Sequence, residues 1–245
     1  MSAKNSRSKT QDKWQHHLQN TWQDKWRRND IAFHQPQVNP LLQQYLPSLK
    51  LCPGDQVLVP LCGKSVDMDW FIQQGLSVIG VEVSAVAIAA YFATLAITPK
   101  QQVQGNFIRW QFEQRQILCG DIFDLRLRDL NKIKLVYDCA ALTALPPQLR
   151  ILYVAHLRRT LPSSSPILLM TVESSETNLT ALDALPSAQR IDSEVSALYQ
   201  KEYQIKLLHG ASCVRIDPEH PSIGPCALDE KVYLLNKLAK PLNTP

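Results

Sequence analysis

The stretch VLVPLCGKSVDMDWF, residues 57–71, joins an apolar run to a Gly-Lys-Ser turn and then to a segment that reads as a helix. Gly-Lys-Ser after a strand is how the phosphate-binding loop of nucleoside triphosphatases ends. That loop also requires a glycine five positions before its Gly-Lys pair, so that several backbone N–H groups can surround a phosphate. Leu58 occupies that position, and Pro60 removes another donor. The stretch therefore does not predict a triphosphate site.

Apolar runs and helical patterns alternate along the rest of the chain. Buried strands are expected at residues 56–62, 77–84, 132–142 and 166–174, a strand pair at 108–125, and helices at 65–75, 85–96 and 146–161. A further helix at 192–203 and two late strands at 203–212 and 230–238 complete the pattern. Strands that alternate with helices predict an α/β fold with a mostly parallel sheet, helices on both faces and an antiparallel C-terminal edge.

Residues 77–97 are long and nearly uncharged, so a membrane span has to be considered. Gly80 and Glu82 interrupt the stretch, and Ser84 is a good helix N-cap. We therefore expect a buried strand followed by a buried helix. By the same reasoning, Ser65 is expected to cap the helix at 65–75, which Gly75 ends.

Composition narrows the class of protein. The net charge is only +4, and the basic residues are spread along the chain, which argues against a nucleic-acid partner. None of the six cysteines stands in a Cys-x-x-Cys pair, so reduced thiols in a cytoplasmic protein are expected, without a metal site. Residues 1–20 are expected to be a flexible basic tail and residues 21–245 a single domain, which we expect to be monomeric.

The amino-terminal region is rich in tryptophan. Trp14, Leu18 and Trp22 recur at helical spacing, with Trp26 one turn further on. The residues alone favour a helix fastened to the core by its apolar face.

Glu82 follows the second predicted strand, about twenty residues after the opening turn. A carboxylate at that spacing lies beside the first turn and can accept bonds from two ribose hydroxyls. The glycine-rich fingerprint of dinucleotide sites is absent. The pattern therefore indicates a nucleoside ligand without phosphates, such as S-adenosyl-L-methionine, with Asp121 or the Ile122 backbone facing its adenine.

Five segments together resemble the thiopurine S-methyltransferase family, in its bacterial form. They are WQDKWRRNDIAFHQ, VLVPLCGKSVDMDWFIQQGLSVIGVEVS, GDIFDL, YDCAALTALPP and EKVYLL, and the likeness spans roughly residues 22–160 and 228–236. The resemblance implies a Rossmann-like fold that transfers a methyl group from S-adenosyl-L-methionine to the sulfur of a small aromatic or heterocyclic thiol. Bacterial relatives also act on selenium or tellurium species.

The resemblance also implies a set of cofactor-binding residues. Trp22 and Trp26 would lie against the cofactor as an aromatic lid, which reverses the interpretation from the residues alone. The Leu61 backbone would receive the methionine end of the cofactor, and Glu82 the ribose. The full expected set is Trp22, Trp26, Phe33, Leu61, Gly63, Glu82, Asp121 and Ile122.

On the acceptor side, Asp138 is the predicted catalytic residue, and His34 and Cys139 are predicted to bind substrate. The family has Asp-Arg where this chain has Asp138-Cys139, and Glu219 stands before His220 where an arginine is expected. Cys139 is expected to be an unreactive small residue. Two alternatives therefore stay open: a methyltransferase for another small acceptor, such as a selenium or tellurium species, and a cofactor-binding protein that has lost its acceptor site.

Overall fold

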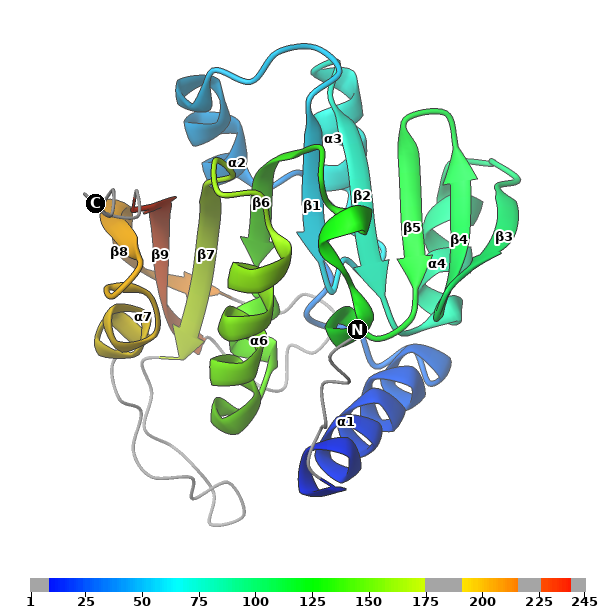
Figure 1. Cartoon of the computed structure of the whole chain (residues 1–245), viewed down its shortest axis with the longest axis horizontal. Coiled ribbons are helices and arrows are strands. Elements are labelled where there is room, and N and C mark those ends of the chain that lie inside the picture. The colour runs from blue at the N-terminus through cyan, green and yellow to red at the C-terminus, as the bar shows by residue number, and fades with distance from the viewer. Residues whose placement is uncertain (1–8, 175–190, 216–225, 239–245) are drawn as a thin grey trace, which may run out of the picture.

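The computed structural model describes residues 9–174, 191–215 and 226–238, and these form one nine-stranded sheet in the order β3-β4-β5-β2-β1-β6-β7-β9-β8 (Figure 1). The strands are β1 (Gln56–Pro60), β2 (Ser77–Glu82), β3 (Lys100–Gln104), β4 (Phe107–Phe112), β5 (Arg115–Cys119), β6 (Ile133–Cys139), β7 (Ile167–Ser174), β8 (Tyr203–Arg215) and β9 (Cys226–Lys237). The α-helices are α1 (Lys9–Arg27), α2 (Pro40–Tyr45), α3 (Asp67–Gln73), α4 (Ala85–Thr94), α5 (Ala141–Ala144), α6 (Pro147–Thr160) and α7 (Ile191–Tyr199). Short 3₁₀ turns are η1 (Leu46–Leu49), η2 (Ile122–Asp124) and η3 (Leu127–Asp129).

The centre of the sheet is parallel. β1 pairs with β2 and β6, β2 pairs with β5, and β6 pairs with β7, all in parallel. The two edges are antiparallel, with β3 and β4 beyond β5 on one side and β9 and β8 beyond β7 on the other. The predicted fold class, including its antiparallel C-terminal edge, is confirmed. The carboxyl ends of the parallel strands share one edge of the sheet, and α1 lies along it (Figure 1).

Each face of the sheet carries its own apolar core, because successive side chains of a strand point to opposite faces. Leu58 and Leu169 face the side covered by α5, α6 and α7. Tyr137 and Leu168 face the side covered by α2, α3 and α4. The central strands are buried on both faces, which is why they are almost continuously apolar in sequence.

Helix starts follow local chemistry in two different ways. The Ser84 hydroxyl accepts the N–H of Ala87 at 3.3 Å, as the sequence predicts. The predicted cap Ser65 is one residue too early, because the N-cap of α3 is Val66. The Ser65 hydroxyl still accepts the N–H of Asp67 at 3.2 Å, which helps to satisfy the first turn of the helix.

Two features of the chain differ from, or extend beyond, the sequence pattern. β3 was not predicted, since its sequence KQQVQ is mostly polar and exposed, and it forms by pairing with β4. α1 begins at Lys9, well before the predicted end of the tail at residue 20.

Residues 77–97 form β2 and α4, as expected. Within the described residues, no helix combines the length and apolarity needed to cross a membrane.

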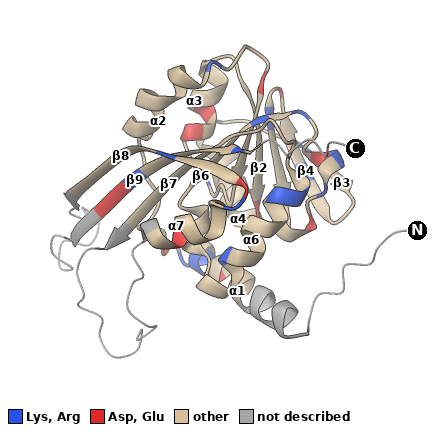
Figure 2. Cartoon of the chain, turned by 60° about the vertical axis from the view of Figure 1, so that its left-hand side comes forward, with Lys and Arg blue, Asp and Glu red and all other residues tan. Residues whose placement is uncertain are grey.

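Charged residues of both signs are interspersed over the helices and strands visible in Figure 2, with no stripe of one sign in that view. The part of the described chain that this view shows carries no extended basic surface.

Candidate functional site

One buried carboxylate joins the turns that follow β1 and β2. Glu82 Oε2 accepts the backbone N–H of Gly63 at 2.9 Å, and Oε1 accepts the N–H of Ser84 at 2.8 Å. The side chain is almost fully buried. Burial raises the pKa of Glu82, while the N–H groups of Ser84 and Gly63 oppose that rise. Each carboxylate oxygen has two lone pairs, so these two bonds leave acceptor capacity for hydroxyl groups of a ligand.

The turn after β1 holds an unusual backbone. Leu61 has φ 47°, in the left-handed region that side chains other than glycine rarely adopt, and Gly63 has φ 52°. A second such residue, Ala140 with φ 62°, follows the end of β6. Both lie at the carboxyl edge of the sheet. Backbone of this kind costs about 1–3 kcal/mol per residue. Lys50, Ala96 and Glu113 adopt it in turns elsewhere, so the conformation alone does not mark a site.

A small cavity of about 50 Å³ opens beside these turns. Four of the residues predicted from sequence line it: Trp22, Leu61, Asp121 and Ile122. The other lining residues, which sequence reasoning missed, are Leu18, Gln19, Val83, Gly120, Phe123, Leu145 and Leu149. The cavity is largely apolar and receives residues from the ends of several strands together with α1. It thus lies where open α/β sheets bind their ligands.

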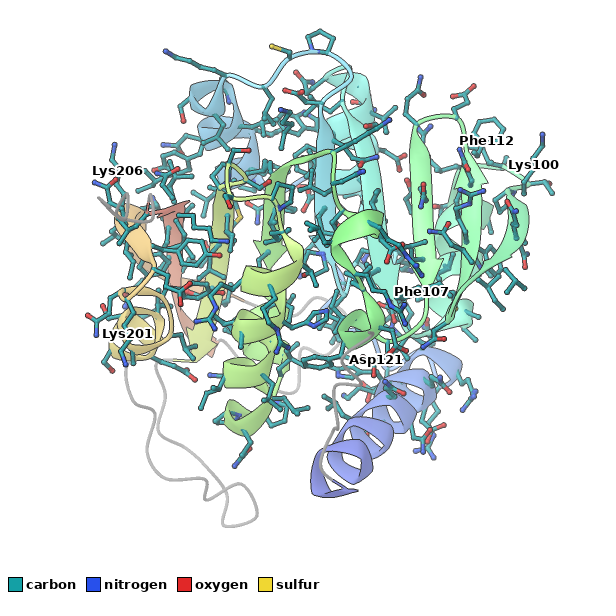
Figure 3. The ribbon with its side chains drawn as sticks, in the orientation of Figure 1. Lys100, Phe107, Phe112, Asp121, Lys201 and Lys206 are labelled. Carbon is teal, nitrogen blue, oxygen red and sulfur yellow. The ribbon has the colours of Figure 1, made fainter. Side chains whose placement is uncertain are left out.

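Asp121 and Ile122 shape the wall that continues from β5. Asp121 is the N-cap of η2, and its carboxylate accepts the N–H of Phe123 at 2.9 Å. The side chain of Ile122 is buried. Figure 3 shows Asp121 beside α1 at the lower edge of the sheet, with Phe107 above it. Phe107 packs against Gly120, where a Cβ would lie 2.6 Å from its ring, so only glycine fits there.

The amino-terminal segment brings three aromatic rings together. Phe33 makes edge-to-face contacts with Trp22 and Trp26, at centroid distances of 5.3 and 5.6 Å. Trp26 is buried, and its indole lies against Gly63. Phe33 is 46% exposed. The three predicted aromatic residues therefore form one cluster over the turn after β1.

Cys139 lies at the end of β6, beside Asn39 from the segment that precedes α2. Its thiol is 3.9 Å from Asn39 Nδ2, and burial is the main cause that raises its pKa to about 12. The Asn39 N–H donates to Asp67 at 2.8 Å, and the Tyr137 hydroxyl donates to the same carboxylate at 2.8 Å. Asn39 thereby fastens the segment after the aromatic cluster to α3 and lies beside β6. His34 is partly buried in the preceding loop, where its backbone N–H donates to Ile31.

Asp138, the predicted catalytic residue, does not line the cavity. It is fully buried, and its carboxylate accepts the Tyr153 hydroxyl at 2.7 Å and the Leu142 N–H at 3.0 Å. Desolvation raises its pKa to about 6. Because the carboxylate is fully buried, contact with a substrate would require the side chains that cover it to move. The role of Asp138 as a catalytic residue stays a prediction.

Glu219 and His220, which the sequence places on the acceptor side, lie outside the described residues. A larger hollow of about 350 Å³ lies between the turn after β3 and the loop from Asp124 to Asp129. There the Asp129 carboxylate accepts the N–H of Arg126 at 2.9 Å and that of Gln104 Nε2 at 3.4 Å, so it is engaged in holding the loop.

Comparison with known proteins gives a consistent result. A family model described as thiopurine S-methyltransferase matches residues 17–238. A protein of that name from Stutzerimonas stutzeri (strain A1501) is 42% identical over 219 residues, which cover 89% of this chain and 91% of that protein. Another from Nitrosospira multiformis is 39% identical and covers 87% of this chain and 96% of that protein.

Among solved structures, the fold is similar to that of a Burkholderia thailandensis 1,6-didemethyltoxoflavin-N1-methyltransferase with bound 1,6-didemethyltoxoflavin and S-adenosylhomocysteine. The TM-score is 0.58 at 15% identity, over 96% of this chain and 97% of that one. At that identity the likeness concerns the fold alone.

Proposed function

Because the chain belongs to the thiopurine S-methyltransferase family, it is an S-adenosyl-L-methionine-dependent methyltransferase, and we propose that its acceptor is the sulfur of a small aromatic or heterocyclic thiol. The thiol acceptor is proposed from the membership of this family. The observation that supports the cofactor site is the Glu82 carboxylate, which joins Gly63 and Ser84 at the carboxyl edge of the sheet beside an apolar cavity. The negatively charged carboxylate at this position can accept hydrogen bonds from ribose hydroxyls. The site has no phosphate-binding loop, which suits a nucleoside that lacks phosphates.

The residues present fit this cofactor in their chemistry. Glu82 would accept the ribose hydroxyls, Leu61 and Gly63 would hold the methionine end through their backbone, and Ile122 with Asp121 would border the adenine. When bound, the cofactor supplies a methyl group already activated on a sulfonium. Trp22, Trp26 and Phe33 would attract that positive centre through their ring faces and exclude water from it.

The cavity is much smaller than the 300–1,000 Å³ typical of small-molecule sites. Leu18, Gln19 and Trp22, all on α1, form part of its lining. We therefore propose that α1 acts as the predicted aromatic lid and moves outward to admit the cofactor. The rest of the wall belongs to the turns after β1, β2 and β5, to η2 and to the segment from Leu145 to Leu149.

The chemistry asks little of the chain beyond alignment. Methyl transfer from a sulfonium is an in-line displacement, so the protein must orient the nucleophile and keep water out. A thiol of low pKa arrives as a thiolate and needs no strong base. This agrees with a site in which Asp138 is engaged by Tyr153 and Leu142, and in which the raised pKa of Cys139 keeps that thiol protonated at neutral pH. His34 and Cys139 stay the predicted contacts on the acceptor side.

The first test is calorimetric titration of the purified protein with S-adenosylhomocysteine, with ATP and NAD as controls. One-site binding that is lost in Glu82→Ala, and absence of binding to ATP and NAD, are the expected results. No binding by folded wild-type protein would overturn the assignment of this site.

The second test addresses the acceptor. The protein is incubated with S-adenosyl-L-methionine and a panel that contains an aromatic thiol, a thiopurine, selenite and tellurite, and products are identified by mass spectrometry. A methylated thiol is the expected product. Methylated selenium or tellurium without thiol methylation would favour the other acceptor class, and cofactor binding without any product would favour a protein that has lost its acceptor site. We also propose that the protein acts in the cytoplasm, as a monomer and without a nucleic-acid partner.

A further inference from the structure

The four-residue helix α5 is held at both ends by side chains from neighbouring elements. At its start, the Asp138 carboxylate accepts the N–H of Leu142. At its end, Arg150 Nη2 donates to the carbonyl of Thr143 at 3.2 Å, and Arg150 Nε donates to the carbonyl of Leu145 at 2.7 Å. A helix this short has almost no stability of its own. Its position therefore depends on these contacts.

Arg150 also ties α5 to α7. Its Nη1 donates to Glu194 Oε2 at 2.5 Å, and the two side chains are only 17% and 18% exposed. One guanidinium on α6 thus meets two carbonyls of the α5 region and a carboxylate of α7. The planar guanidinium presents its N–H groups in fixed directions, which a lysine ammonium cannot reproduce.

The segment that Arg150 holds forms part of the candidate cofactor cavity. Leu145, whose carbonyl accepts the Arg150 Nε–H, lines the cavity together with Leu149 on the following turn. These two leucines share the cavity with Ile122 and Phe123, at the end where the adenine is expected. Arg150 itself is not among the lining residues. It acts on the cavity through the backbone that it bonds.

We propose that Arg150 is a positioning residue for S-adenosyl-L-methionine binding, which holds the Leu145 wall of the cavity in place and links that wall to Glu194 on α7. The inference rests on the proposed function, because it takes this cavity as the cofactor site. A purely structural Arg150 would affect the stability of the fold and leave the cofactor affinity of the folded protein unchanged.

The test compares Arg150→Met with a matched control on the same helix. Arg158, also on α6, forms an ion pair with Glu202 just after α7, so Arg158→Met removes an α6 ion pair that is remote from the Thr143 and Leu145 carbonyls. Affinity for S-adenosylhomocysteine is measured by calorimetry at a temperature where each variant is folded. Hydrogen exchange of the backbone at residues 140–149 is measured on the same samples.

In Arg150→Met we expect about three- to thirtyfold weaker binding and faster exchange at residues 140–149. In Arg158→Met we expect binding within about twofold of the wild type, since long-range couplings below that size are within measurement error. Arg150→Lys keeps the positive charge opposite Glu194 but loses the planar set of N–H donors. Its affinity for S-adenosylhomocysteine should therefore lie between those of Arg150→Met and the wild type.

Binding by folded Arg150→Met within twofold of the wild type would overturn the inference. Should Arg150→Met not fold, Arg150→Lys provides the decision, because it keeps the charge opposite Glu194 and loses the paired bonds to the Thr143 and Leu145 carbonyls. A measurable loss of affinity in folded Arg150→Lys is then expected, and an affinity within twofold of the wild type would overturn the inference. Glu194→Gln tests the link to α7 separately, and an unchanged affinity in that variant would contradict the link. Failure of the wild type to bind would instead contradict the proposed function.

Discussion

The indole of Trp26 lies so close to the backbone of Gly63 that a Cβ added at residue 63 would stand 2.9 Å from Trp26 Cζ2. A helix from the start of the chain and the turn after β1 therefore meet without room for a single methyl group. Gly63 also has φ 52°, which adds a backbone requirement to the steric one.

Gly63→Ala tests this contact. We expect the free energy of unfolding to fall by about 2–4 kcal/mol, from left-handed strain together with overpacking against the indole. Gly105→Ala is the matched control, because Gly105 has φ 60° and nothing within 4 Å of an added Cβ. It should lose only about 1–2 kcal/mol. Urea unfolding followed by tryptophan fluorescence gives both values, and equal losses would show that the Trp26 contact costs nothing.

Glu82→Gln should weaken both the fold and the cofactor site. An amide has one acceptor oxygen, so the N–H of Gly63 or of Ser84 loses its partner, at a cost of about 1–3 kcal/mol in stability. Affinity for S-adenosylhomocysteine should fall about tenfold or more, since bonds to a charged acceptor are the stronger ones. Calorimetry and urea unfolding measure the two effects. Glu113→Gln, at an exposed side chain, should change neither, and wild-type affinity in Glu82→Gln would refute the role of the carboxylate.

Asp138 should make stability depend on pH in an identifiable way. Burial raises its pKa from 3.8 to about 6, so between these values the folded protein binds a proton that the unfolded chain has released. The contribution of this group therefore falls as the pH rises from about 4 to 6, by up to about 3 kcal/mol, and is constant above that range. The difference in unfolding free energy between the wild type and Asp138→Asn, measured from pH 4 to 7.5, isolates the effect. A difference that does not vary with pH would contradict the raised pKa.

Two buried tyrosines provide a paired test of the hydroxyl that faces Asp138. The Tyr153 hydroxyl donates to Asp138, whereas the buried Tyr199 hydroxyl has no hydrogen-bond partner within the described part of the chain. Tyr153→Phe should therefore cost about 1–3 kcal/mol, and Tyr199→Phe should be neutral or slightly stabilising. Thermal and urea unfolding of both variants measures the contrast. Similar losses in the two variants would mean that the bond to Asp138 contributes nothing.

Cys139 should resist alkylation at neutral pH. Only the thiolate reacts, and a pKa of about 12 leaves almost none of it at pH 7.5. Iodoacetamide treatment followed by peptide mass spectrometry should label the exposed Cys52 well before Cys139. Rapid labelling of Cys139 in the folded protein would contradict an unreactive thiol at this position.

Much of the fold could be predicted because the central strands are buried on both faces, as in the continuous apolar run that includes Val57 and Leu58. The cap Ser84 was likewise readable, since its chemistry is local. β3 was not, because its polar sequence becomes a strand only through pairing with β4. The predicted cap Ser65 lies one residue before the N-cap of α3, which is Val66. Short spacing does not record that the adjacent Gly63 contacts Glu82 and Trp26.

The sequence by itself determined the order of the central strands and their helices, the family and the presence of a carboxylate after the second strand, since all three depend on residue types at short spacing. Tertiary structure alone decided that Glu82 bonds both neighbouring turns and that Asp138 accepts a hydrogen bond from α5. It also decided that Arg150 donates to the carbonyl of Leu145 in the cavity wall. The physical reason is that burial and bond partners depend on which distant segments meet. No spacing along the chain records that Tyr153 points at Asp138 or that Trp26 covers Gly63.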